Sequence, residues 1–113
     1  MDYLHYNLFM NIVIYTKKGL LNVISQNRDK IKSFGVKELG LFGSFVTEKG
    51  INENSDVDFL VDFEPGSKTY DNFMDLSFFL EKILGRKVEL VTPQSLSKYL
   101  SPHILKQVEH VSL

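Results

Sequence analysis

The sequence predicts a single small α/β domain, in which helices pack on a mixed β-sheet. Segments with apolar residues at helical spacing alternate along the chain with short runs rich in β-branched and aromatic residues. With 113 residues, the chain is long enough for one hydrophobic core but too short for a separate substrate-binding domain. We therefore expect any large substrate to be presented by another molecule.

The first predicted element is an amphipathic helix over residues 16–34. Thr16 is suited to be its N-cap, and Gly35 is suited to end it. Residues 1–15 precede this helix and are interpreted as an N-terminal extension of undefined role. The predicted domain comprises residues 16–113.

Two strands are expected next, at residues 36–42 and 56–63. The first is short and apolar and stops at Gly43, whereas the second places hydrophobic residues at every other position. A polar loop over residues 47–55, rich in Gly, Asn and Glu, connects them. A Pro-Gly turn then ends the second strand.

The remaining elements follow the same logic. A helix is predicted at residues 67–84 with Gly85 as its stop, and a third strand is predicted at residues 87–91. Pro93 marks the start of one short closing helix, and Ser101 is suited to be the N-cap of another. The predicted order is helix, strand, strand, helix, strand, helix, helix.

Composition excludes several classes of protein. Thirteen basic and 14 acidic side chains give a formal charge of −1. The sequence has no run of Lys and Arg residues that could contact a phosphate backbone, so autonomous binding of long nucleic acid is not expected. The absence of cysteine excludes a disulfide framework, a thiolate zinc site and a cysteine nucleophile. No apolar run approaches the roughly 20 residues of a membrane span, and the start of the chain lacks a signal-peptide pattern. We expect a cytoplasmic protein without a membrane contact.

The strongest chemical signal is a pair of acids at the start of the second strand, in the run Ser-Asp-Val-Asp-Phe. Asp56 and Asp58 are two residues apart, so an extended strand points both carboxylates to one face, about 7 Å apart. Two such acids can share divalent cations. The alternative is an ordinary strand with one solvated face. Asp62 lies about 13 Å further along the strand and is interpreted as a strand-end residue.

Gly43 and Ser44 follow the first strand directly. A glycine lets the backbone approach a ligand closely, and successive amide groups can bind a phosphate. The spacing matches neither a Walker A loop nor a nucleophile elbow, so Ser44 is interpreted as a phosphate ligand rather than an attacking group. The alternative is a plain turn.

Glu89 is the lone acid of the short third strand. A neighbouring strand could bring it beside Asp58, which would give a third carboxylate for holding two magnesium ions; the alternative is an exposed glutamate at the sheet edge. The three histidines, His5, His103 and His110, do not have metal-ligand spacing and are interpreted as surface or partner-facing residues.

These motifs resemble the minimal nucleotidyltransferases of the DNA polymerase β superfamily, which include antitoxins paired with HEPN-domain toxins. The resemblance extends from about residue 16 to residue 111 and rests on Leu-Gly-Leu-Phe-Gly-Ser, Asn-Ser-Asp-Val-Asp-Phe-Leu-Val and Val-Glu-Leu-Val-Thr. It implies a polymerase β-like core that binds the triphosphate of ATP and two magnesium ions. The implied phosphate ligands are Gly43 and Ser44, and the implied metal ligands and catalytic residues are Asp56, Asp58 and Glu89.

The resemblance also implies a function: transfer of AMP from ATP to a hydroxyl, on a tyrosine of a partner HEPN toxin, by a protein that acts as an antitoxin. Two departures from the family pattern motivate an alternative, a catalytically weak antitoxin that neutralises its partner by binding alone. The loop after the Gly-Ser turn lacks the usual arginine, and the third acid is Glu89 where aspartate is common. A receiver-like phosphoacceptor domain would need an acidic pair near the first strand, which we do not find.

One further surface is predicted on the helix at residues 67–84. Met74 and Phe78 fall one turn apart, off the stripe that faces the core. These two residues either contact the partner protein or belong to a helix that the small core covers on two sides.

Overall fold

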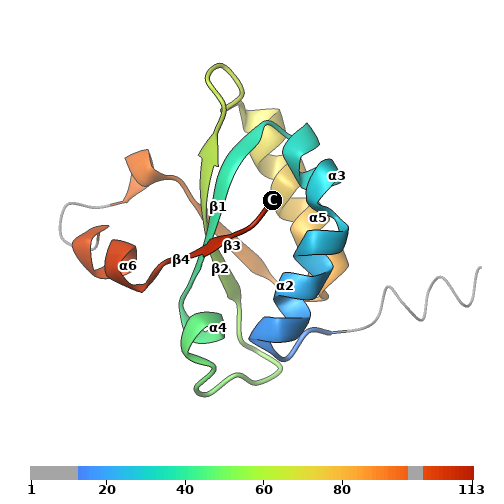
Figure 1. Ribbon diagram of the computed structural model, residues 1–113, viewed down its shortest axis with the longest axis vertical. Helices are drawn as coiled ribbons and strands as arrows, with labels where there is room; N and C mark the ends of the chain where they lie inside the picture. Colours follow the sequence, from blue (N-terminus) through green and yellow to red (C-terminus); the bar gives the residue numbers. More distant parts are fainter. Residues whose placement is uncertain (1–12, 97–100) are drawn as a thin grey trace, which may run out of the picture.

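The computed structural model describes residues 13–96 and 101–113. It consists of a four-stranded sheet between two unequal layers (Figure 1). The larger layer, on one face of the sheet, contains α2 (Lys17–Gln26), α3 (Arg28–Ser33) and α5 (Tyr70–Leu84). On the other side lie α6 (Ser101–Gln107) and the 3-10 turn η1 (Pro93–Ser95), so much of that face is left open.

The strand order in the sheet is β3-β2-β1-β4. The two central strands, β1 (Val36–Phe42) and β2 (Val57–Phe63), are antiparallel, and β3 (Val88–Val91) runs parallel to β2 after the crossover through α5. The edge strand β4 (Glu109–Val111) is antiparallel to β1. The predicted fold class, a small mixed sheet with helices packed on it, is confirmed.

The helix predicted over residues 16–34 is in fact two helices, α2 and α3. Thr16 is the N-cap as expected, because its side chain accepts a hydrogen bond from the amide of Gly19 at 3.0 Å. The break is at Asn27, whose backbone leaves helical geometry (φ −115°, ψ 15°) while its side-chain amide donates to the carbonyl of Val23 at 2.8 Å. An asparagine side chain that bonds to the backbone competes with the helix in this way.

Two short elements were not predicted. The polar loop between β1 and β2 starts with a single turn of helix, α4 (Ser44–Thr47), and the chain closes with β4 after α6. With three residues, β4 is too short to show an alternation of apolar and polar residues. It forms because β1 offers an unpaired edge. An ion pair between Lys17 and Glu109 also joins β4 to α2. The two predicted closing helices are present as the 3-10 turn η1 and the helix α6, and β4 follows them.

The core lies between the sheet and the larger helical layer. Along β2 the side chains alternate between buried and half-buried, and the buried set, Val57, Phe59, Val61 and Phe63, faces the helices. The fully buried residues of α5, Leu76, Leu80 and Leu84, complete this core. The other face of β2 therefore presents Asp58, Leu60 and Asp62 to the open side of the sheet. Within the described ranges, no helix is long and apolar enough to cross a membrane.

Candidate active site

Gly43 lies directly against Asp58. The strand register pairs Phe42 with Asp58, so the residue after Phe42 lies beside the carboxylate. Gly43 has φ 79° and ψ −153°, and a Cβ built at this position would overlap Oδ2 of Asp58. Both the backbone conformation and the space thus require glycine here.

Glu89 lies beside Asp58 on the neighbouring strand. The parallel register of β2 and β3 pairs these two residues directly, so the adjacency that the sequence analysis raised as an option is present in the fold. Asp58 is half-buried, whereas Glu89 is exposed. Gly43, Asp58 and Glu89 therefore meet where three strands lie side by side.

The pKa of Asp58 is raised from its ordinary value of 3.8 to about 6. The largest cause is burial of the carboxyl group, followed by the negative charges of Glu89 and Asp56 and by a hydrogen bond with Glu89. Asp56 directly precedes β2, so its charge acts on Asp58 from the start of the strand. Carboxylates gathered in this way favour a cation as a neighbour, since a cation would remove the repulsion between them.

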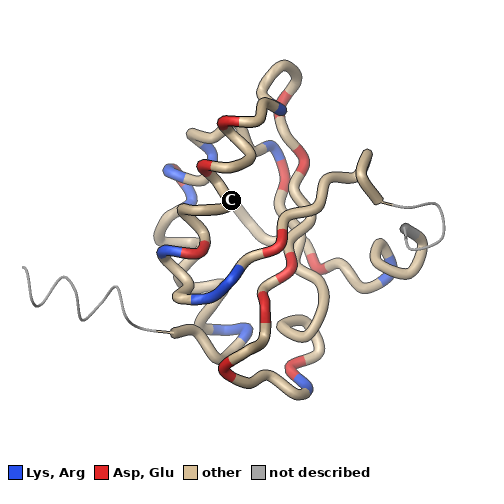
Figure 2. The backbone as a smooth tube through the Cα atoms, turned by 180° about the vertical axis from the view of Figure 1, so that it is seen from behind, with Lys and Arg blue, Asp and Glu red and all other residues tan. Residues whose placement is uncertain are grey.

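Acidic and basic residues are distributed differently between the sheet and the helices. In Figure 2, acidic positions are grouped along the strands, whereas most basic positions lie on the helices. Asp62 is one of these acidic residues of the strands. It lies opposite Glu38 at the far end of β2 and apart from Asp56, Asp58 and Glu89, as expected for a strand-end residue.

A cavity of about 150 Å³ lies on the open face of the sheet, beside Asp62 rather than the three clustered acids. Gly40 and Leu60 line it from β1 and β2, and Pro93 and His110 line it from η1 and β4. Gly40 has a packing role here, because a Cβ at this position would come within 2.5 Å of Cγ1 of Val108.

Ser44 begins α4, immediately after Gly43, and is half-buried. Its carbonyl accepts a hydrogen bond from the amide of Glu48 at 2.7 Å, which closes the turn. The predicted phosphate ligands Gly43 and Ser44 thus lie together at the carboxylate cluster, joined by the backbone of one tight turn.

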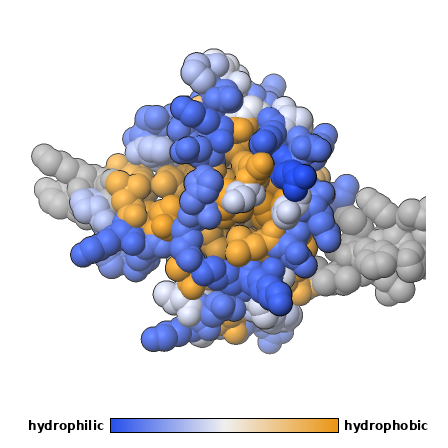
Figure 3. All heavy atoms as spheres, viewed as in Figure 1, coloured by the Kyte–Doolittle hydropathy of each residue, from blue (hydrophilic) through white to orange (hydrophobic). Residues whose placement is uncertain are grey.

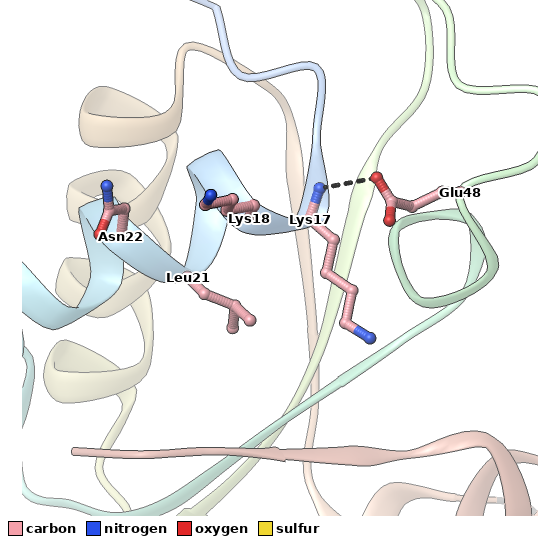
Figure 4. Close-up of a pocket in the computed structure, with 5 residues that line it drawn as sticks. All are labelled: Lys17, Lys18, Leu21, Asn22 and Glu48. Atoms are coloured by element: carbon pink, nitrogen blue, oxygen red, sulfur yellow. Dashed lines mark hydrogen bonds between the residues drawn. The ribbon is translucent and has the colours of Figure 1, made fainter.

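The loop that departs from the family pattern has a structural role at Glu48. This residue adopts a left-handed conformation (φ 56°), and its Oε2 accepts a hydrogen bond from the backbone amide of Lys17 at 3.2 Å, as Figure 4 shows. The two residues line an open pocket of about 390 Å³ together with Lys18, Leu21 and Asn22. The carboxylate of Glu48 caps the positive end of α2. None of the three clustered acids lines this pocket.

The remaining predicted surface residues lie away from the acids or outside the described residues. His103 and His110 are exposed on α6 and β4, as expected, and His5 lies outside the described residues. Phe78 is 60% exposed on α5, and Met74 is half-buried. Because α5 belongs to the helical layer, Phe78 lies on the opposite side of the sheet from Asp58. On the face seen in Figure 1, apolar residues also reach the middle of the surface and are surrounded by hydrophilic ones (Figure 3).

Sequence reasoning missed Arg86, the one charged side chain that is buried among the residues described, at 6% exposure. Its side chain donates hydrogen bonds to the carbonyls of Asn52 and Ser55, next to Asp56. A basic residue after a helix-ending glycine has the pattern of a solvated charge, so the sequence carried no signal for this role.

The fold and the grouping of a Gly-Ser turn with strand carboxylates define a nucleotide-transferring enzyme class. The family model for the nucleotidyltransferase domain matches residues 22–110, and the chain belongs to this family. Among named relatives, it is 34% identical over 101 residues to the protein adenylyltransferase MntA of Thermococcus cleftensis, covering 88% of this chain and all of that protein.

Two crystal structures have a similar fold. One, of a toxin–antitoxin pair with AMP-PNP, superimposes with a TM-score of 0.60 at 26% identity, over 81% of this chain and 72% of that chain. Another, of the toxin–antitoxin pair MntA–HepT, gives a TM-score of 0.54 at 26% identity, over 84% of this chain and 71% of that chain. These matches agree with the polymerase β-like core expected from the sequence.

Proposed function

We propose that this protein is an antitoxin that transfers AMP from ATP to a tyrosine hydroxyl of a partner HEPN-domain toxin. The observation that carries the proposal is the meeting of Gly43, Asp58 and Glu89 at adjacent strands. The relative MntA is named a protein adenylyltransferase, and MntA is paired with HepT in one similar structure and AMP-PNP is present in another. The size of the chain is consistent with an acceptor supplied by a second protein.

The phosphate-binding role is assigned to Gly43 and Ser44. Because Gly43 lacks a Cβ, the turn packs directly against the carboxylate of Asp58, so a phosphate bound by the turn would lie close to the metal-binding acids. The hydroxyl of Ser44 is suited to donate a hydrogen bond to a phosphate oxygen. The two residues would orient the triphosphate so that its α-phosphorus faces the acids.

The chemistry of the three acids fits magnesium. Asp56, Asp58 and Glu89 supply hard oxygen donors, and burial together with the charges of Glu89 and Asp56 raises the pKa of Asp58. Within the described part of the chain, no three acidic or histidine side chains form a complete metal site by themselves. The carboxylates would therefore supply part of the coordination, and the nucleotide phosphates would supply the rest. Bound magnesium would lower the pKa of the acceptor hydroxyl and neutralise charge on the triphosphate.

The reaction exchanges one bond to phosphorus for another. The acceptor oxygen forms a bond to the α-phosphorus while the bond from that phosphorus to the bridging oxygen breaks, which releases pyrophosphate. The hydroxyl proton leaves the acceptor, and the acids at the start of β2 are placed to receive it. Because these acids lie on the open face of the sheet, the acceptor reaches them from the side opposite the main helical layer.

The second candidate is an antitoxin that neutralises its partner by binding without transfer. It is favoured by one specific observation: Glu48 caps α2 in the loop where the family usually carries an arginine. That loop therefore contributes a carboxylate bound within the protein rather than a cation for the substrate.

Intact mass spectrometry distinguishes the two candidates. The protein is mixed with the product of its neighbouring gene, magnesium and ATP, and the mass of that product is recorded. We expect a gain of one or more AMP residues, which is lost in Asp56→Asn. Asp62→Asn is the matched control, because Asp62 is an acid on the same strand face but outside the cluster. A stable complex without any gain in mass would support binding alone.

A further inference from the structure

Arg86 is buried between the end of α5 and the start of β3, where its guanidinium bonds only to backbone among the described residues. Its Nε donates to the carbonyl of Ile14 at 2.5 Å, and one terminal nitrogen donates to the carbonyls of Asn52 and Ser55, both at 2.8 Å. These three carbonyls belong to two segments that lie 31 to 72 residues away from Arg86 in the sequence. A single side chain thus ties distant segments together.

The segment from Asn52 to Ser55 forms a closed turn. The amide of Ser55 donates to the carbonyl of Asn52 at 3.1 Å, and the amide of Asn52 donates to Oγ of Ser55 at 3.0 Å. Arg86 binds the carbonyl at each end of this turn, so it fixes the turn as a unit.

Asp56 is the next residue, and the chain is held on both of its sides. The carbonyl of Ser55 is bound by Arg86, and the amide of Val57 donates to the carbonyl of Lys87 at 3.0 Å. Two consecutive residues, 86 and 87, therefore fix the backbone on either side of Asp56. The same segment continues into β3, which carries Glu89 opposite Asp58.

The guanidinium also contacts the phosphate-binding turn. Its central carbon lies 5.1 Å from the centre of the Phe45 ring, which is fully buried and directly follows Ser44. It lies 4.7 Å from the centre of the Tyr15 ring as well. Such cation–ring contacts contribute to the packing of a desolvated guanidinium.

The guanidinium of Arg86 also carries a cost in stability. Within the described residues, the second terminal nitrogen is buried without a hydrogen-bond partner. The planar fork of the guanidinium lets one side chain bind the carbonyls of Asn52 and Ser55 together, which fixes their geometry.

We propose that Arg86 is a positioning residue that sets Asp56 against Asp58 and Glu89, and so determines how tightly the acids hold a divalent cation with the nucleotide. The inference rests on the proposed function, since it assigns the cation to that same site. Arg86 itself does not contact the reacting atoms. It acts through the carbonyls of Asn52 and Ser55, which hold the turn before Asp56.

The test is calorimetric titration of Mn²⁺ into the full chain in the presence of AMP-PNP. We expect Arg86→Met and Arg86→Lys to weaken Mn²⁺ binding at least about tenfold, because neither can bridge two carbonyls with a planar fork. Lys82→Met is the matched control, since Lys82 is an exposed basic residue in the last turn of α5, and it should bind within about twofold of the wild type. Thermal unfolding of each variant confirms that titrations are made on folded protein.

The outcomes separate this inference from the proposed function. If a folded Arg86 variant binds Mn²⁺ as the wild type does, Arg86 is only a packing residue and the inference is wrong. If both Arg86 variants fail to fold, Tyr15→Leu, which removes one ring from the guanidinium, must still weaken Mn²⁺ binding at least twofold for the inference to stand. If the wild type binds Mn²⁺ with AMP-PNP but modifies no toxin, the proposed function fails while the Arg86 comparison remains valid.

Discussion

The α-carbon of Gly43 and the carboxylate of Asp58 are so close that no side chain can be placed between them. This contact brings the Gly43-Ser44 turn, the proposed phosphate ligand, and the acidic strand β2 to one point. It depends on the register of β1 and β2, which pairs Phe42 with Asp58.

We predict that Gly43→Ala abolishes transfer and destabilises the fold. The new Cβ would displace the Asp58 carboxylate, and φ of 79° is unfavourable for alanine, so we expect a loss of about 1–3 kcal/mol in the free energy of unfolding. Denaturant unfolding and the rate of toxin modification measure the two effects.

Gly66→Ala is the control for this backbone strain. Gly66 has a similar φ of +80°, but no described atom lies within 4 Å of the Cβ position. It should lose stability while keeping transfer. If both variants transferred AMP equally well, the contact with Asp58 would be irrelevant to activity.

Asp58→Asn should abolish transfer and yet stabilise the metal-free protein at neutral pH. The pKa of Asp58 is raised to about 6 from 3.8, so the folded state binds the proton more tightly than the unfolded state. The stabilising contribution is present below about pH 4 and is lost as pH rises through about 6. Asparagine does not ionise, and the variant therefore escapes this loss.

Thermal unfolding across that pH range, with a chelator present, measures the effect. The wild type and the variant should differ most at neutral pH and least near pH 4. A difference that is constant with pH would contradict the raised pKa of Asp58. Added magnesium and ATP should raise the unfolding temperature of the wild type only.

Glu89→Gln should reduce transfer about a hundredfold or more, because the variant loses one negative ligand beside Asp58. Glu89→Asp should retain measurable transfer, because the carboxylate is kept on the same strand position. Initial rates at several magnesium concentrations measure both variants. Equal rates for Glu89→Gln and the wild type would make Glu89 an ordinary edge-strand residue.

Glu48→Ala should lower the free energy of unfolding by about 0.5–1 kcal/mol without a change in the rate of transfer. The variant loses the carboxylate that binds the first amide of α2, and the loss of such a cap has this size. Glu53→Ala, in the same loop, is the control. A large decrease in transfer by folded Glu48→Ala would instead place this loop in contact with the substrate.

Much of the fold was predictable because local patterns determined it. The bounds predicted for β1 agree with the structure, and β2 starts one residue later than expected. The break at Asn27 was missed, since it depends on a side chain that bonds to the backbone inside a continuous amphipathic pattern. β4 was missed because its three residues form a strand only through pairing with β1, which is distant in the sequence.

The candidate site was predictable as a set of residue types but not as a geometry. The spacing of Asp56 and Asp58 on a strand indicated the acids, and the pairing of Glu89 with Asp58 was one of two options left open. The closeness of Gly43 to Asp58 follows from the register of β1 and β2, which cannot be read from local sequence patterns. Arg86 could not be found, because its partners are backbone carbonyls that only the folded loop brings together.

The acidic cluster also determines in which form a nucleotide can enter. Free triphosphate is an anion, and Asp56, Asp58 and Glu89 would repel it at short range because their charges already oppose one another. A triphosphate that carries its cation brings the missing positive charge with it. If the three acids bind the metal as proposed, we expect metal and nucleotide to bind as one complex, and ATP in excess over magnesium to be a poor competitor.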